Sequence, residues 1–190
     1  RSIDTSMGMS ALGGPVMGTR SGDIDPALCA FLHRTMELTP EEVEKCLYHD
    51  SGLKALAGTG DMREIEIKAA KGDKGALLAL DVFARSVRHY IGAYVVAMNG
   101  VDVLAFTGGI GEHSSVIRKR ICTGLEFMGL HFDEGKNADV KLENYEAPQI
   151  QKDDSQVKVI VTKTREQWMI AQDVERILTL FFQDRERLKI

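Results

Sequence analysis

The sequence lacks the features that would suggest a membrane protein or a nucleic-acid-binding protein. No apolar run approaches the roughly 20 residues that a membrane-spanning helix needs. Lysines and arginines are scattered along the chain and the formal net charge is −4, so nucleic-acid binding is not expected. The three cysteines, Cys29, Cys46 and Cys122, lie far apart without CxxC or Cys/His ligand spacing, which fits a reducing cytoplasm best.

Several catalytic motifs are also missing. The chain has no Gly-Lys-Ser/Thr sequence, which excludes a P-loop, and the dinucleotide-binding pattern would need glycine where Ser114 stands. Residues 18–22 spell GTRSG, but the nucleophile elbow of a serine hydrolase has serine at its centre, and the centre here is Arg20. Catalysis by a nucleophilic serine is therefore not expected.

The length and composition indicate a globular protein. With 190 residues, of which 44% are apolar and 27% charged, the chain can bury one good core, alone or with an appendage. It opens with Arg1 in place of methionine and shows no signal peptide. We therefore expect a piece of a longer protein.

Residues 101–118, VDVLAFTGGIGEHSSVIR, join an expected strand to an expected helix through a glycine turn. The apolar run over 101–106 is typical of a strand covered on both faces, and the helix should begin near Ser114. Such a turn can bind an anion, because glycines let the backbone approach a ligand and the first N–H groups of the helix are free. An ordinary tight turn explains the same residues about equally well.

The periodicity predicts an α/β arrangement around this unit. Apolar residues recur at three- and four-residue steps over 73–99, which predicts a long helix directly before the strand. Residues 157–162, VKVIVT, predict a second buried strand, and after Thr164 a helix with a broad apolar face is expected. This order of elements predicts a crossover on the face of a sheet.

Other stretches carry weaker signals. Residues 2–9 have some strand character, residues 53–65 are expected to be irregular, and short strands and polar turns are expected to alternate over 129–145. Asp61 and Arg63 lie in the irregular stretch. Without other support they indicate a solvated loop with a local ion pair, which contributes at most a fraction of a kcal/mol.

Three stretches in order resemble the acetate kinase family: MGTRSGDIDP at 17–26, DMREI at 61–65 and FTGGIGEH at 106–113. The likeness runs from SIDTSMGM at 2–9 to TREQWMIA at 164–171. It implies the α/β fold shared by acetate and sugar kinases, the Hsp70 ATPase and actin. In this fold two related domains close on ATP at the cleft between them, and each is a ribonuclease H-like domain of the actin-like ATPase type. This chain would be the second of the two domains.

The resemblance also implies a division of the chain. Residues 1–165 would form the C-terminal nucleotide-binding domain, and residues 166–190 would form a helix that packs on an N-terminal domain absent from this chain. The family's other functional residues lie in that absent half. We therefore expect the chain alone to be inactive, and we expect a homodimer formed through the present domain.

The resemblance assigns site residues at four places. Arg20 matches the arginine that stabilises the transition state of phosphoryl transfer, because a planar guanidinium can hold two oxygens of the transferred group. Asp61, Met62 and Arg63 match the adenosine-binding segment. Glu166 matches a position tied to magnesium, although an acid favoured by the helix dipole in a first turn is the rival explanation. The second nucleotide loop is matched by Gly109, Ile110, Gly111, Glu112 and His113.

Three positions depart from the family pattern. His113 stands where many members carry asparagine, so its hydrogen bonding becomes pH-dependent in principle. Gln167 stands in place of the second of two glutamates. Ala11 replaces a proline in the wall of the acyl pocket, so the choice between acetate and propionate stays open.

The function implied is that of an acetate kinase, which transfers a phosphoryl group from ATP to acetate, reversibly and with Mg²⁺, to give acetyl phosphate and ADP. A propionate kinase is one alternative. A non-catalytic nucleotide-binding module of the actin and Hsp70 type is another. Arg20 favours a kinase, because a module without phosphoryl transfer has no evident need for the GTRSG motif.

Overall fold

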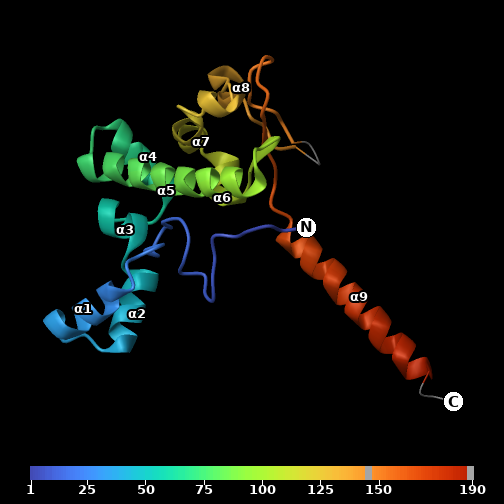
Figure 1. Ribbon diagram of the computed structural model, residues 1–190, viewed down its shortest axis with the longest axis horizontal. Coiled ribbons are helices and arrows are strands. Elements are labelled where there is room, and N and C mark those ends of the chain that lie inside the picture. Colours follow the sequence, from blue (N-terminus) through green and yellow to red (C-terminus); the bar gives the residue numbers. More distant parts are fainter. Residues whose placement is uncertain (144–146, 188–190) are drawn as a thin grey trace.

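The computed structural model describes residues 1–143 and 147–187, which form a mainly helical body with a small sheet (Figure 1). The elements in chain order are α1 (Ala27–Met36), α2 (Pro40–His49), α3 (Gly52–Ala57), α4 (Met62–Ala70), α5 (Lys74–Met98), β1 (Val103–Phe106), α6 (Gly108–His113), α7 (Ser115–Cys122), the 3₁₀ helix η1 (Glu126–Met128), α8 (Glu134–Ala138), β2 (Lys158–Val161) and α9 (Glu166–Arg187). No helix among the described residues is long and apolar enough to cross a bilayer.

Strands β1 and β2 form a parallel pair. Val103 pairs with Lys158 at one end and Phe106 with Val161 at the other. Between the strands the chain passes through α6, α7, η1 and α8, so the connection is a crossover, as the sequence predicted. The α/β class is therefore confirmed, with a sheet of two strands in the described part of the chain.

The two strands differ in burial. Alternate residues of β2 are buried in the core, as expected for this strand. In β1, Phe106 is buried but Val103 is 47% exposed and Ala105 is exposed. The prediction that this strand is covered on both faces is wrong for the described chain, because the helical body covers only the face that carries Phe106.

Helix α5 is the element on which the body packs (Figure 1). It confirms the long helix predicted over 73–99. Asp73 caps its start by accepting a hydrogen bond from the N–H of Ala76 at 2.8 Å, and Asn99 ends it in the left-handed conformation with φ 57°. Helices α3, α4 and α7 contact it. Its buried residues are Ala76, Ala79, Leu80, Phe83, Ala84 and Ile91.

The stretch predicted to be irregular over 53–65 is helical instead. Helix α3 ends at Gly58, which has φ 75°, and α4 begins directly after Asp61. Leu53 and Ile65, one in each helix, are fully buried. Two short helices separated by glycines show too few apolar repeats for a clear helical period, which explains why the sequence pattern missed them.

Two stretches with predicted strand character are not strands. Residues 2–9 form no strand and are mostly exposed. Residues 129–143 contain α8 and one isolated bridge between Phe132 and Gln151; residues 144 and 145 of that prediction lie outside the described residues. Strand propensity depends on a neighbouring strand against which to pack, and neither stretch lies in a sheet here.

Helix α9 extends away from the body (Figure 1). It begins where a helix was predicted, after Thr164. All side chains over residues 166–181 are exposed, including Trp168 at 57% and Ile177 at 60%. Residues 188–190 of the predicted segment 166–190 lie outside the described residues. The apolar side of the described part of α9 is thus largely exposed.

Candidate functional site

The carboxyl ends of the two parallel strands are joined by a small hydrogen-bond network. The hydroxyl of Thr164, after β2, lies 2.8 Å from the hydroxyl of Thr107, after β1, and accepts from the N–H of Gly108 at 2.8 Å. Glu112 accepts from the N–H of Thr164 at 2.7 Å and from the N–H of Gly108 at 3.1 Å. Ligands of parallel α/β sheets bind at this end of the strands, so this edge is where a site is expected.

The predicted glycine turn is the short helix α6. The N–H of Gly108 at the start of this helix has no partner within the helix, and it donates instead to Glu112 and to the hydroxyl of Thr164. The following helix begins as predicted, since the hydroxyl of Ser114 caps α7 by accepting from the N–H of Ile117 at 2.9 Å. A Cβ on Gly109 would meet no atom within 4 Å, so the backbone of this residue borders open space.

Glu112 carries the negative charge of this network. Burial would raise the pKa of Glu112, but hydrogen bonds from Thr164 and Gly108 outweigh burial and hold that pKa below its usual value of 4.5. The carboxylate is therefore ionised at neutral pH. The carboxylate accepts from the backbone N–H groups of Gly108 and Thr164, so the side chain of this predicted nucleotide-binding residue shapes the loop.

Arg118 holds the other end of α6. Its side chain is 2% exposed, and Nη1 donates to the carbonyls of Gly111 and Glu112 at 2.9 Å each. Nε and Nη2 donate to Asn137 in α8 at 2.7 and 3.0 Å. Burial lowers the pKa of Arg118, yet a guanidinium keeps its charge at neutral pH. One buried cation thus joins the predicted nucleotide loop to α8.

The predicted adenosine-binding segment forms the start of α4. Asp61 caps the helix by accepting from the N–H of Arg63 at 2.9 Å, and the guanidinium of Arg63 donates to both carboxylate oxygens at 3.0 and 2.6 Å. This guanidinium lowers the pKa of Asp61 to about 2. The local ion pair considered from the sequence is therefore present. The side chain of Met62 is buried in the core, which leaves its backbone for a ligand.

Two contacts bring the predicted segments together. The hydroxyl of Ser114 donates to Glu66 of α4, which docks α4 on the junction between α6 and α7. On the other side, Gly18 packs against Gly60 so closely that a Cβ on Gly18 would lie 3.0 Å from the carbonyl oxygen of Gly60. The loop that carries Arg20 therefore lies directly against the residues before α4.

Arg20 lies on a loop before α1, as predicted. Its Nη1 donates to the carbonyl of Ala11 at 3.3 Å, and its guanidinium lies 5.7 Å from the centre of the Tyr48 ring. The backbone of this loop packs on Gly52, where φ is 63° and a Cβ would lie 2.5 Å from the carbonyl oxygen of Arg20. The catalytic role of Arg20 stays a prediction.

The remaining predicted residues follow the carboxyl ends of the two strands. Glu166 is the first residue of α9, two positions after Thr164, and its side chain is exposed. His113 ends α6 and is also exposed. Ile110 packs partly against the core. The nucleotide and metal roles of these residues likewise stay predictions.

Sequence reasoning missed two residues that hold the site in place. Arg118 was not singled out, because a buried arginine on a helix looks like a surface residue until its partners are known. Asp23 accepts from the N–H of Gly14 at 2.8 Å and from the hydroxyl of Tyr90, and these bonds lower the pKa of Asp23. This closes the loop that contains Arg20. The occurrence of Asp23 within the GTRSGDIDP motif was the signal that could have revealed it.

Replacing Arg118 should destabilise the protein strongly. In Arg118→Met the carbonyls of Gly111, Glu112 and Asn137 lose their donors inside the protein, which should lower the free energy of unfolding by about 2–4 kcal/mol. Lys119→Gln is the matched control, because Lys119 pairs with Glu134 at an exposed site and its loss should cost about 1 kcal/mol or less. Urea unfolding measures both, and equal small losses would contradict the role given to Arg118.

Glu112 should make stability depend on pH. Because its pKa is lower in the folded than in the unfolded protein, its contribution is present above the unfolded value of 4.5 and is lost as pH falls through the folded value. The difference in free energy of unfolding between the parent and Glu112→Gln should therefore shrink from about pH 7 to about pH 3. A difference independent of pH would refute this. Glu44→Gln, an exposed change on α2, serves as control.

Comparison with known proteins identifies relatives of this chain. The sequence pattern of the Acetokinase family matches residues 1–172. The acetate kinase of Carboxydothermus hydrogenoformans is 47% identical over 173 residues, which cover 91% of this chain and 42% of that protein.

Solved structures agree. The crystal structure of Porphyromonas gingivalis acetate kinase matches with a TM-score of 0.83 and 40% identity, covering 91% of this chain and 43% of that one. A propionate kinase from Francisella tularensis subsp. tularensis SCHU S4 matches with a TM-score of 0.82 and 41% identity, covering 90% and 43%. This chain thus spans less than half the length of these relatives, and it belongs to the acetokinase family.

Proposed function

We propose that this chain is the nucleotide-binding part of an acetate kinase, which transfers a phosphoryl group between ATP and acetate, reversibly and with Mg²⁺. The observation that carries the proposal is the linkage of the predicted segments at one side of the fold. Gly18 lies against Gly60, Glu66 bonds to Ser114, and Glu112 bonds to Thr164. Family membership supports the use of ATP.

We assign to Arg20 the binding of the phosphoryl group during its transfer. Negative charge spreads over three oxygens of that group in the transition state, and a guanidinium can bind two of them at once. The carbonyl of Ala11 and the ring of Tyr48 both contact the guanidinium. Fixed placement matters because a donor that is already oriented costs no reorganisation when charge develops.

We assign the nucleotide to residues 61–63 and 109–113. Backbone groups are the natural contacts, since Met62 is buried, Gly109 borders open space and the carboxylate of Glu112 is engaged within the loop. Arg63 is 86% exposed, so its guanidinium can turn from Asp61 toward a ligand.

The residues of this chain fit a magnesium ion that is bound mainly by water and substrate phosphates. No group of three or more His, Cys, Asp or Glu side chains that could hold a metal occurs among the described residues. Mg²⁺ is commonly bound by one or two carboxylates together with water and substrate phosphates. Glu166 would supply one such carboxylate. The bound ion would offset charge on the phosphates.

The family resemblance implies that Ala11 lies in the wall of the acyl pocket, so the identity of the carboxylate substrate would depend on the surroundings of Ala11. A propionate kinase remains the second candidate, because Ala11 replaces a proline in that wall and a propionate kinase is among the similar structures. The carbonyl of Ala11 is also a contact of Arg20. Changes in this wall would therefore act on both the acyl group and the guanidinium.

The complete protein would include a further domain, which this proposal places against α9. The relatives are more than twice as long as their match to this chain. The exposed apolar side chains of α9, such as Trp168 and Ile177, would pack on that domain. The isolated chain would be inactive, and the complete protein would be a cytoplasmic homodimer.

A hybrid protein tests the catalytic proposal. It joins the residues of the C. hydrogenoformans acetate kinase that precede its match to this chain to residues 1–190 of this chain. The hybrid should form acetyl phosphate from acetate and ATP, and Arg20→Ala should lower kcat by about 10²–10³-fold with little change in KM for ATP. A coupled assay of ADP release with acetate, propionate and butyrate measures this and ranks the substrates.

The controls use the same hybrid. Arg34→Ala removes an exposed arginine at the end of α1 and should leave kcat unchanged. Glu166→Gln should raise the Mg²⁺ concentration needed for half-maximal rate, and an unchanged requirement would remove Glu166 from the metal site. Turnover of Arg20→Ala within a few-fold of the parent would contradict the role of Arg20, and no turnover on any substrate would favour a non-catalytic module.

The fluorescence of Trp168 tests the placement of α9. This tryptophan is the only one in the sequence and is 57% exposed. In the hybrid, its emission should move to shorter wavelength and its quenching by acrylamide should fall relative to the 190-residue chain. The difference between the hybrid and its Trp168→Phe variant isolates this signal. Equal quenching in both proteins would show that α9 stays uncovered.

A further inference from the structure

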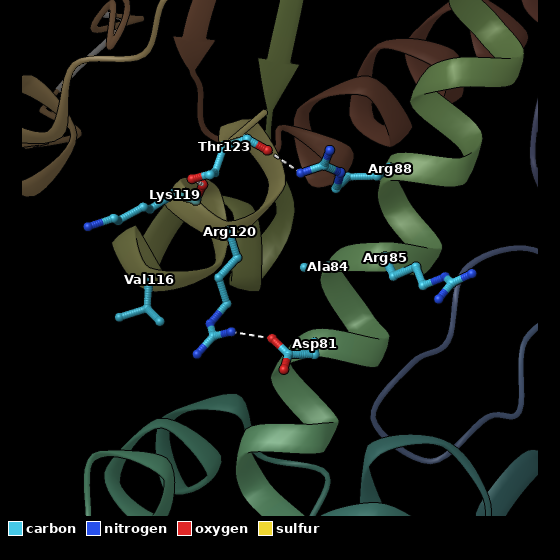
Figure 2. Close-up of a pocket in the computed structure, with 8 residues that line it drawn as sticks. All are labelled: Asp81, Ala84, Arg85, Arg88, Val116, Lys119, Arg120 and Thr123. Atoms are coloured by element: carbon cyan, nitrogen blue, oxygen red, sulfur yellow. Dashed lines mark hydrogen bonds and ion pairs between the residues drawn. The ribbon is translucent and has the colours of Figure 1, made fainter. Parts of the chain in front are cut away.

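A hollow of about 610 Å³ lies between α5 and α7. Figure 2 shows its lining from two helices, with Asp81, Arg85 and Arg88 on α5 and Arg120 on α7. The volume lies within the range of small-molecule sites. None of the predicted site residues at 20, 61–63, 109–113 or 166 lines it.

The charge around this hollow differs from that of the whole chain. Four of its eight lining residues are cationic, namely Arg85, Arg88, Lys119 and Arg120, and one, Asp81, is anionic. The whole chain has a net charge of −4. Four of the 24 lysines and arginines of the chain therefore line one hollow, and an excess of positive charge attracts anions.

Two of the guanidiniums are held by contacts across the gap. Arg120 of α7 pairs with Asp81 of α5, and Arg88 of α5 donates to the carbonyl of Thr123 at the end of α7 (Figure 2). Each contact engages one nitrogen, whereas a guanidinium has five N–H donors. The remaining donors are therefore oriented before a ligand arrives.

The side chains of the other two cations point away from the hollow (Figure 2). Lys119 points away from α5 in Figure 2 and pairs with Glu134 at 2.7 Å. Arg85 has neither a hydrogen bond nor an ion pair within the described chain. In Figure 2 its side chain points to the side of α5 that faces away from α7, so its guanidinium lies outside the gap between the two helices.

Helix dipoles explain only part of this arrangement. Lys119 and Arg120 lie in the last turn of α7, where cations are favoured by the helix dipole. Arg85 and Arg88 lie in the middle of the 25-residue helix α5, where no such effect operates. The helix dipole therefore does not explain why the guanidinium of Arg88 faces α7.

We propose that the hollow between α5 and α7 binds the diphosphate group of a small anion. Guanidiniums match phosphate oxygens in pairs, and two of them, those of Arg88 and Arg120, lie across the hollow from one another. Ala84 and Val116 add apolar surface that can contact an organic part of the ligand. Inorganic pyrophosphate and a nucleoside diphosphate share this chemistry. The site is additional to the nucleotide segments of the proposed function.

Titration of the 190-residue chain with pyrophosphate and with ADP tests this. Isothermal calorimetry should give saturable binding of at least one of them that weakens as salt is raised. Arg88→Gln combined with Arg120→Gln should lower the affinity by about tenfold or more. The matched control combines Arg34→Gln with Lys45→Gln, which removes the same charge from exposed positions on α1 and α2 and should leave the affinity unchanged.

Amide chemical shifts measured on the unmutated chain locate the bound ligand without the risk that a substitution has altered the fold. Pyrophosphate should perturb residues 81–88 and 116–123. Binding of ADP alone would assign the site to a nucleoside diphosphate, and binding of both would assign it to the diphosphate group. Perturbation confined to 61–63 and 109–113 would support the proposed nucleotide site and overturn this one. Absence of saturable binding, or equal weakening in the control variant, would also overturn it.

Discussion

The hydrogen bonds among Glu112, Gly108 and Thr164 are the constraint on which the candidate site depends. The two strands share only four residue pairs, so the loops that follow them would be weakly fixed by the sheet alone. A carboxylate accepts the first N–H of α6 and the N–H of Thr164, while Arg118 donates to the last carbonyls of α6. A six-residue helix is unstable by itself. Opposite charges at its two ends therefore make it part of a rigid edge.

The sequence predicted the elements whose signal is long or strongly apolar. Helix α5 and strand β2 were found because their patterns persist over the whole element. Helices α3 and α4 were missed because each is short and glycines separate them. The strand expected over 2–9 failed because a strand needs a partner, which the described chain does not provide for this stretch.

The site was predictable to a different extent. Resemblance placed the segments around Arg20, Asp61 and Gly109, but it could not say which side chains hold them. Asp23 and Arg118 do so through contacts between residues distant in the sequence or hidden in the core. The cations of the hollow between α5 and α7 likewise come from two helices separated by a strand. Such groupings arise only when the chain is folded, so residue spacing does not reveal them.

The contact between Gly18 and Gly60 links two loops through bare backbone. A Cβ on either glycine would lie 3.0 or 2.9 Å from a carbonyl oxygen of the other loop, so no side chain separates the loops and neither can slide freely. The loop that carries Arg20 and the residues before α4 are therefore expected to move together. Under the proposed roles of Arg20 and residues 61–63, a hinge motion that displaced one loop would displace the other, so the contacts to the phosphoryl group and to the nucleoside would be made or broken together.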